Sequence, residues 1–128
     1  MSYQNSKTVN YSFDDAITKI TEELKKEGFG ILTEIDVKET LKKKLDVDFR
    51  KYKILGACNP PYAYKALQME ENIGVLLPCN VIVQEKENSK VQVSVINPME
   101  SMKAVGNEAL GEVAQEISKK LISVLDAI

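Results

Sequence analysis

The segment Lys90–Val95 constrains the fold more than any other part of this sequence. Valine occupies every second position, and the residues between the valines are polar. Side chains alternate between the two faces of a strand, so this strand has one buried and one solvated face. Parallel sheets covered by helices on both faces lack this alternation. The pattern therefore predicts an antiparallel sheet with helices gathered on one face.

A second strand-like run precedes this segment and is expected to form a hairpin with it. Residues Val75–Gln84 are mainly apolar and β-branched, and Glu87–Ser89 supplies the turn. Because Pro78 cannot donate a hydrogen bond to a neighbouring strand, we expect pairing to begin after it.

Two longer segments have the apolar spacing of amphipathic helices. The first is expected from Phe13 to about Glu27, with Ser12 as its N-cap and Gly28 as its left-handed stop. The second spans 110–128 and is the cleanest such pattern in the chain. It predicts a C-terminal helix of about five turns.

Shorter elements complete the order β-α-β-α-β-α-β-β-α. A short helix is expected from Asp36 to Leu45, with Val37 and Leu41 also on its buried stripe, and another helix follows Pro60. The remaining strands are expected at Lys7–Tyr11, Gly30–Ile35 and Tyr52–Cys58. The predicted class is α+β.

The composition is typical of a globular protein with a single core. The chain has 128 residues, 44% hydrophobic and 28% charged, so we expect a single domain over residues 1–128. No apolar run approaches the ~20 residues of a membrane helix, and the start lacks a secretory signal, which indicates the cytoplasm and no membrane partner. The net charge of −2 argues against nucleic acid as a partner. The basic stretch Lys38–Lys53 is interpreted as a solvated surface.

The only two cysteines lie in Cys-Asn dipeptides at the ends of apolar segments. Cys58-Asn59 and Cys79-Asn80, together with Glu34, are the candidate ligand-binding residues. Each also has a simpler structural interpretation: the thiols as core packing, Asn59 as a helix cap, Asn80 as a partner for a disrupted strand edge, and Glu34 on an exposed sheet face. If the valines of the same strand face the helices, Cys79 faces them too, and Asn80 points the opposite way.

Several kinds of chemistry remain open at these residues. The leading hypothesis is a non-catalytic pocket for a small molecule or thiol ligand, lined by the two dipeptides. The alternatives are a cysteine-dependent enzyme or sulfur carrier using Cys58, and a protein-interaction scaffold. The chain has no histidine, which argues against an enzyme and against a four-ligand zinc site. We expect no cofactor and no metal, although a two-coordinate soft metal, a site shared across a dimer, or help from Met99 and Met102 stays open. The two methionines have a simpler interpretation as packing before the final helix.

Four segments of the sequence carry a resemblance to a known family. They are Gly28–Val37, Gly56–Pro60, Gly74–Asn80 and Ile96–Met99. As an ordered set they resemble the domain-of-unknown-function 302 family (DUF302), and the likeness spans most of the chain from Tyr11 onward.

The resemblance implies a small bacterial or archaeal α+β protein with a curved antiparallel sheet, similar in form to the TATA-binding-protein fold. It also implies a homodimer without an assigned activity. Some members are associated with sulfur-metabolism proteins, so the resemblance implies thiol or persulfide handling at Cys58 and Cys79. Likeness to a DNA-binding fold does not transfer DNA binding.

Overall fold

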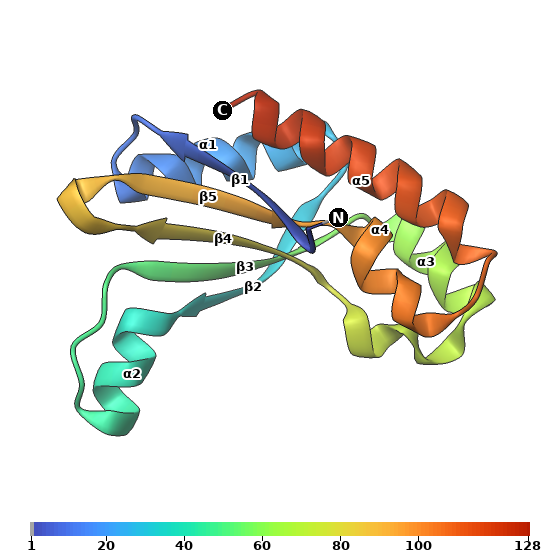
Figure 1. The fold of residues 1–128 in the computed structure, drawn as a ribbon, viewed down its shortest axis with the longest axis horizontal. Coiled ribbons are helices and arrows are strands. Elements are labelled where there is room, and N and C mark those ends of the chain that lie inside the picture. Colours follow the sequence, from blue (N-terminus) through green and yellow to red (C-terminus); the bar gives the residue numbers. More distant parts are fainter. Residues whose placement is uncertain (1) are drawn as a thin grey trace.

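The computed structural model describes residues 2–128 and has the predicted α+β architecture (Figure 1). All neighbouring strands of its five-stranded sheet are antiparallel, and the sheet is open, with the order β1-β5-β4-β3-β2. The strands are β1 (Gln4–Val9), β2 (Gly30–Asp36), β3 (Tyr52–Cys58), β4 (Cys79–Glu85) and β5 (Val91–Ile96).

Two of the helices cover one face of this sheet. In Figure 1, α1 and α5 lie on the same side of the strands, while α3 and α4 lie beyond the end of the sheet. The α-helices are α1 (Phe13–Lys26), α2 (Val37–Leu45), α3 (Pro60–Met69), α4 (Pro98–Ser101) and α5 (Leu110–Asp126). Short 3-10 helices are η1 (Glu71–Leu76), η2 (Glu87–Ser89) and η3 (Met102–Val105).

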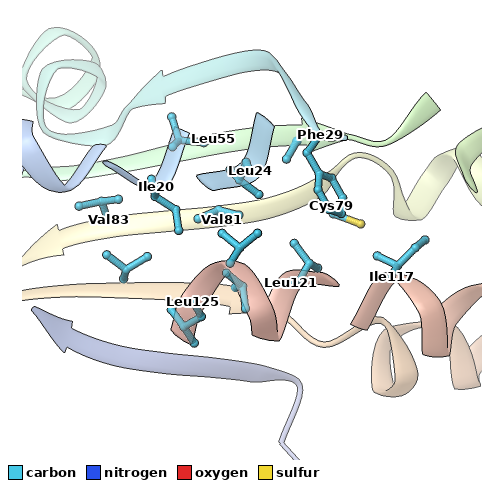
Figure 2. Close-up of a cluster of buried hydrophobic side chains, with 14 of the residues drawn as sticks. Ile20, Leu24, Phe29, Leu55, Cys79, Val81, Val83, Ile117, Leu121 and Leu125 are labelled. Atoms are coloured by element: carbon cyan, nitrogen blue, oxygen red, sulfur yellow. The ribbon is translucent and has the colours of Figure 1, made fainter. Parts of the chain in front are cut away.

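The core lies between the sheet and these two helices. The three valines of β5 are at most 1% exposed, which confirms that they form the buried face of a half-solvated strand. They belong to the same buried cluster as Ile20 and Leu24 from α1 and Leu121 from α5, each fully buried. Figure 2 shows these three side chains between the sheet and the helices. Burial of each such side chain contributes about 1.5–3 kcal/mol.

Two of the three predicted helix caps are present. Ser12 Oγ accepts a hydrogen bond from the Asp15 amide at 3.1 Å, and Asp36 Oδ1 accepts one from the Glu39 amide at 3.0 Å. Gly28 has a φ of 88°, the left-handed conformation that suits a residue just beyond a helix end.

Two strand boundaries differ from the prediction. β1 begins and ends earlier than the expected Lys7–Tyr11, because its pairing with β5 selects Gln4–Val9 from a sequence with little alternation. The first two residues of the expected strand Val75–Gln84 are instead the end of η1, and Val75 is 86% exposed. Pairing of β4 begins at Cys79, directly after Pro78, as expected.

The predicted buried stripe of α2 is wrong. No residue of α2 is buried, and Leu45 is 66% exposed. The helix packs on β2 and β3 at one side of the sheet and projects away from α1 and α5 (Figure 1). The apolar spacing predicts which side chains share a helix face, but not whether another element lies within reach of that face.

Candidate functional site

A pocket lies where β3 ends and β4 begins. Antiparallel pairing places Ala57 opposite Cys79, so the two Cys-Asn dipeptides are brought to the same end of the sheet. The pocket has a volume of about 250 Å³. Apolar side chains from the β2 region, α3, η3 and α5 form its walls, namely Phe29, Leu32, Tyr62, Ala66, Met102 and Ile117.

Three of the five candidate residues line this pocket. Cys58 and Asn59 come from the end of β3, and Cys79 comes from the first position of β4. Met102 adds the thioether of a third sulfur-bearing residue and is only 6% exposed. We call this space the sulfur pocket, defined by Cys58, Cys79 and Met102.

Asn80 and Glu34 lie outside the sulfur pocket. Asn80 is exposed and points to the opposite sheet face from Cys79, in keeping with the alternation of side chains along a strand. Glu34 is exposed on the edge strand β2, where one carboxylate oxygen lies 3.8 Å from Lys53 Nζ. Glu34 is therefore exposed to solvent, as its simpler structural interpretation predicted.

The two thiols have different environments. Cys79 is 7% exposed, and burial, together with the nearby Cys58, raises the pKa of its thiol to about 11. At neutral pH Cys79 is therefore protonated and a weak nucleophile. Cys58 is half-buried, and both cysteines are free thiols. Figure 2 shows Cys79 at the end of the buried core that also holds Phe29 and Ile117.

Asn59 joins three segments at the pocket wall. It occupies the N-cap position of α3, but its side chain does not cap the helix, contrary to the expected role. Its Nδ2 instead donates to the Glu27 carbonyl at 3.1 Å. A Cβ at Gly28 would lie 3.2 Å from that same nitrogen, so the glycine allows both the positive φ and the close approach of Asn59.

Gly56 allows the chain before β4 to lie close against β3. A Cβ at this position would lie 2.8 Å from Pro78 Cγ and 2.2 Å from Thr33 Oγ1. The missing side chain therefore lets Pro78 pack on β3 one residue before Cys79. This contact helps to position one wall of the sulfur pocket.

Sequence reasoning missed several wall residues. Tyr62 is half-buried, with Lys65 Nζ 5.4 Å and Lys120 Nζ 6.0 Å from its ring centroid. Met102 was expected to pack before the final helix, which it does, but no sequence signal places it beside the cysteines. The exposed Leu32 lies at the bulge between Ile31 and Thr33, and a bulge in an edge strand leaves no clear periodic signal.

The described residues offer few groups for other kinds of site. Among residues 2–128, no cluster of three or more His, Cys, Asp or Glu side chains could hold a metal ion. Within the same range, no helix has the length and hydropathy needed to cross a bilayer.

Comparisons with known proteins agree with the fold. A crystal structure of an uncharacterized conserved DUF302 protein from Bacillus stearothermophilus superposes with a TM-score of 0.93. The two sequences are 30% identical, and the match covers 99% of this chain and 98% of the other. None of the curated proteins compared with the chain is similar to it. The pattern of the family described as "Domain of unknown function DUF302" matches residues 5–128, so this chain belongs to the DUF302 family.

Proposed function

We propose that this protein binds a small, mainly apolar ligand in the sulfur pocket and does not transform it. The observation that carries the proposal is that Cys58, Asn59 and Cys79, from separate parts of the sequence, line one pocket with Met102. Concave, mainly apolar spaces with a few polar groups are the usual form of small-molecule sites. The protonated state of Cys79 favours contact with a ligand over attack on it.

The size of the pocket limits the ligand. Its volume of about 250 Å³ is the share of about eight water molecules and lies just below the usual range for drug-sized sites. A single aromatic or short aliphatic group, or a small thiol or thioether, fits this space. Free thiols in the site suit a reducing compartment such as the cytoplasm.

The proposal can be tested by filling the pocket, either with a small molecule or with a larger side chain. Small apolar molecules, including thiols and thioethers, would be screened by ¹H–¹⁵N NMR and by protection of Cys58 against iodoacetamide. Ala63 lines the pocket and is half-buried, so Ala63→Leu should block it, whereas Ala104→Leu, at an exposed position away from the pocket, is the matched control. The proposal fails if no molecule both shifts pocket amides and protects Cys58, or if Ala63→Leu binds as well as the control.

A cysteine-dependent enzyme or sulfur carrier is the second candidate function. The half-buried Cys58 thiol lies at the pocket, two residues before α3, which gives a ligand access to it. This function requires alkylation of Cys58 to stay fast well below the pH at which a free thiol ionises. The rate of alkylation against pH, measured in a Cys79→Ser background, separates the two functions. An ordinary or slow rate excludes the enzyme.

We also propose that the protein is a homodimer that pairs through the sheet face opposite α1 and α5. The strand registers place fourteen uncharged residues on this neutral face, in a chain that is 28% charged. They are Gln4, Ser6, Thr8, Thr33, Ile35, Tyr52, Ile54, Gly56, Asn80, Ile82, Gln84, Gln92, Ser94 and Ile96. A cation, Arg50, contacts two of them: its Nε donates to Gln84 Oε1 at 3.0 Å, and its guanidinium lies 5.4 Å from the Tyr52 ring centroid. Depletion of charge is typical of interface cores, and an uncharged face can meet its own copy without repulsion.

The area of this face is compatible with a modest interface. Five strands about 4.8 Å apart and about 20 Å long present about 500 Å² per copy, against about 800 Å² in a standard interface. The projecting α2, with its exposed Leu45, could supply the remainder. Ile82→Glu, at the centre of the face, should give a monomer in sedimentation equilibrium. Ile122→Glu, on the exposed side of α5, is the control, and a monomeric wild-type protein would refute the proposal.

A further inference from the structure

Two strand-to-helix junctions of this fold are built alike. Asn59 connects β3 to α3 with φ −106° and ψ 99°, and Asn97 connects β5 to α4 with φ −105° and ψ 99°. A proline follows each asparagine at the first helical position.

The nitrogen atoms of the two side chains have equivalent partners. Asn59 Nδ2 donates to the carbonyl of Glu27, just before β2, at 3.1 Å. Asn97 Nδ2 donates to the carbonyl of Ser2, just before β1, at 3.0 Å. Each asparagine therefore ties its junction to the chain entering the adjacent edge strand.

The side-chain oxygens differ between the junctions. Asn97 Oδ1 accepts hydrogen bonds from the Met99 amide at 3.1 Å and from Ser118 Oγ at 3.4 Å. Asn59 Oδ1 accepts from no group among residues 2–128, although Asn59 is only 7% exposed. Its nitrogen is already committed to Glu27, which fixes the oxygen as the free end of the amide.

One residue removes the donor that bonds Asn97 at the equivalent junction. The helix amide that bonds Asn97 belongs to Met99, the second helical residue. The corresponding residue after Asn59 is Pro61, which has no N–H to donate. An N-cap oxygen normally pairs with the amide of the second or third helical residue, and the first of these is absent here.

The free oxygen is not sealed from solvent. Among the described residues, no side-chain oxygen or nitrogen is both sealed from solvent and unpaired, so Asn59 Oδ1 keeps some accessible surface. Asn59 lines the sulfur pocket, and its other walls are largely apolar. A nearly buried acceptor in apolar surroundings gains from any donor that enters.

We propose that Asn59 Oδ1 is the polar recognition point of the sulfur pocket, and that the ligand is a small apolar molecule carrying one N–H or O–H donor. The inference rests on the proposed function and narrows it to a chemical class. Pro61 acts as the positioning residue, because it withholds the backbone donor that would otherwise occupy the oxygen.

Indole and benzofuran test this inference, because they share one shape while only indole carries an N–H. Their dissociation constants would be measured by calorimetry for the wild type, Pro61→Ala and Pro60→Ala. Pro61→Ala restores an amide at the second helical position, which should cap Asn59 Oδ1. Pro60→Ala is the matched control, since it restores an amide only at the first position, where an N-cap side chain does not bond.

We expect the wild type and Pro60→Ala to bind indole about three- to tenfold more tightly than benzofuran, and Pro61→Ala to lose this preference while still binding both. Equal binding of the two probes to the wild type overturns the inference and leaves the proposed pocket intact. A preference that persists in Pro61→Ala also overturns it. Failure of both probes to bind the wild type also overturns the inference, whereas the proposed pocket fails only if the wider screen of small apolar molecules finds no binder.

Discussion

Gly56→Ala should destabilise the protein by a steric mechanism that the structure defines. The new Cβ would lie 2.2 Å from Thr33 Oγ1 and 2.8 Å from Pro78 Cγ, both closer than real Cβ contacts. The Thr33 side chain can rotate away at modest cost. The Pro78 ring cannot, because its position is set by the backbone that leads into β4.

The expected cost follows from these two contacts. Overpacking a filled site typically costs about 1–3 kcal/mol, and a rigid ring on one side places Gly56→Ala near about 2–3 kcal/mol. Removing the movable partner should recover part of this loss. The double variant Gly56→Ala/Thr33→Ala is therefore expected to be about 1 kcal/mol more stable than Gly56→Ala alone.

Urea unfolding followed by far-UV circular dichroism would measure these differences. Gly30→Ala is the matched control, because it lies in the adjacent strand and no atom lies within 4 Å of its added Cβ. It should change the free energy of unfolding by less than about 0.5 kcal/mol. If Gly56→Ala costs no more than Gly30→Ala, the close packing of Pro78 on β3 is refuted.

Three further predictions concern stability. The pKa of Cys79 is raised from 9.0 to about 11. The stability that the protein gains from holding this thiol neutral is therefore fully present below pH 9 and is lost as the pH rises from 9 to 11. Unfolding titrations should show a loss of about 2–3 kcal/mol over that interval, absent in Cys79→Ala. Asn97→Ala removes the partners of the Met99 amide and of Ser118 and should lower the unfolding free energy by about 1–3 kcal/mol, where no change would exclude its capping role. Gly111→Ala, exposed in the first turn of α5, should raise the thermal midpoint through about 0.5–1 kcal/mol of helix propensity, and a lower midpoint would contradict this.

The elements predicted best from sequence are those whose burial pattern is periodic. The β4–β5 hairpin and α5 have apolar residues at the spacing of their own secondary structure, so their buried faces could be assigned in advance. β1 has little alternation of apolar and polar residues, and α2 has only three apolar residues on its predicted stripe. Their boundaries and burial depend on which partner the rest of the chain provides, and a local pattern does not contain that information.

The candidate site was predictable to a similar degree. Alternation along β4 separated Cys79 from Asn80 without knowledge of the fold. The meeting of Cys58 with Cys79 required the pairing of β3 with β4, which no local feature specifies. The position of Met102 required the path of the chain after β5, and η3 is too short to be recognised from sequence.

The sequences Asn59-Pro-Pro and Asn97-Pro-Met form equivalent strand-to-helix junctions. Neither sequence indicates a function alone, but the difference between the two junctions does. Each asparagine alone predicts a helix cap, and the second proline alone predicts only a rigid helix start. Because the two asparagines have matching dihedral angles, the capped oxygen of Asn97 indicates the hydrogen bond that the oxygen of Asn59 would make if residue 61 had an amide hydrogen. The cap hydrogen bond is present at Asn97 and missing at Asn59. The missing bond lies at the wall of the sulfur pocket, where a donor group of a ligand can replace it.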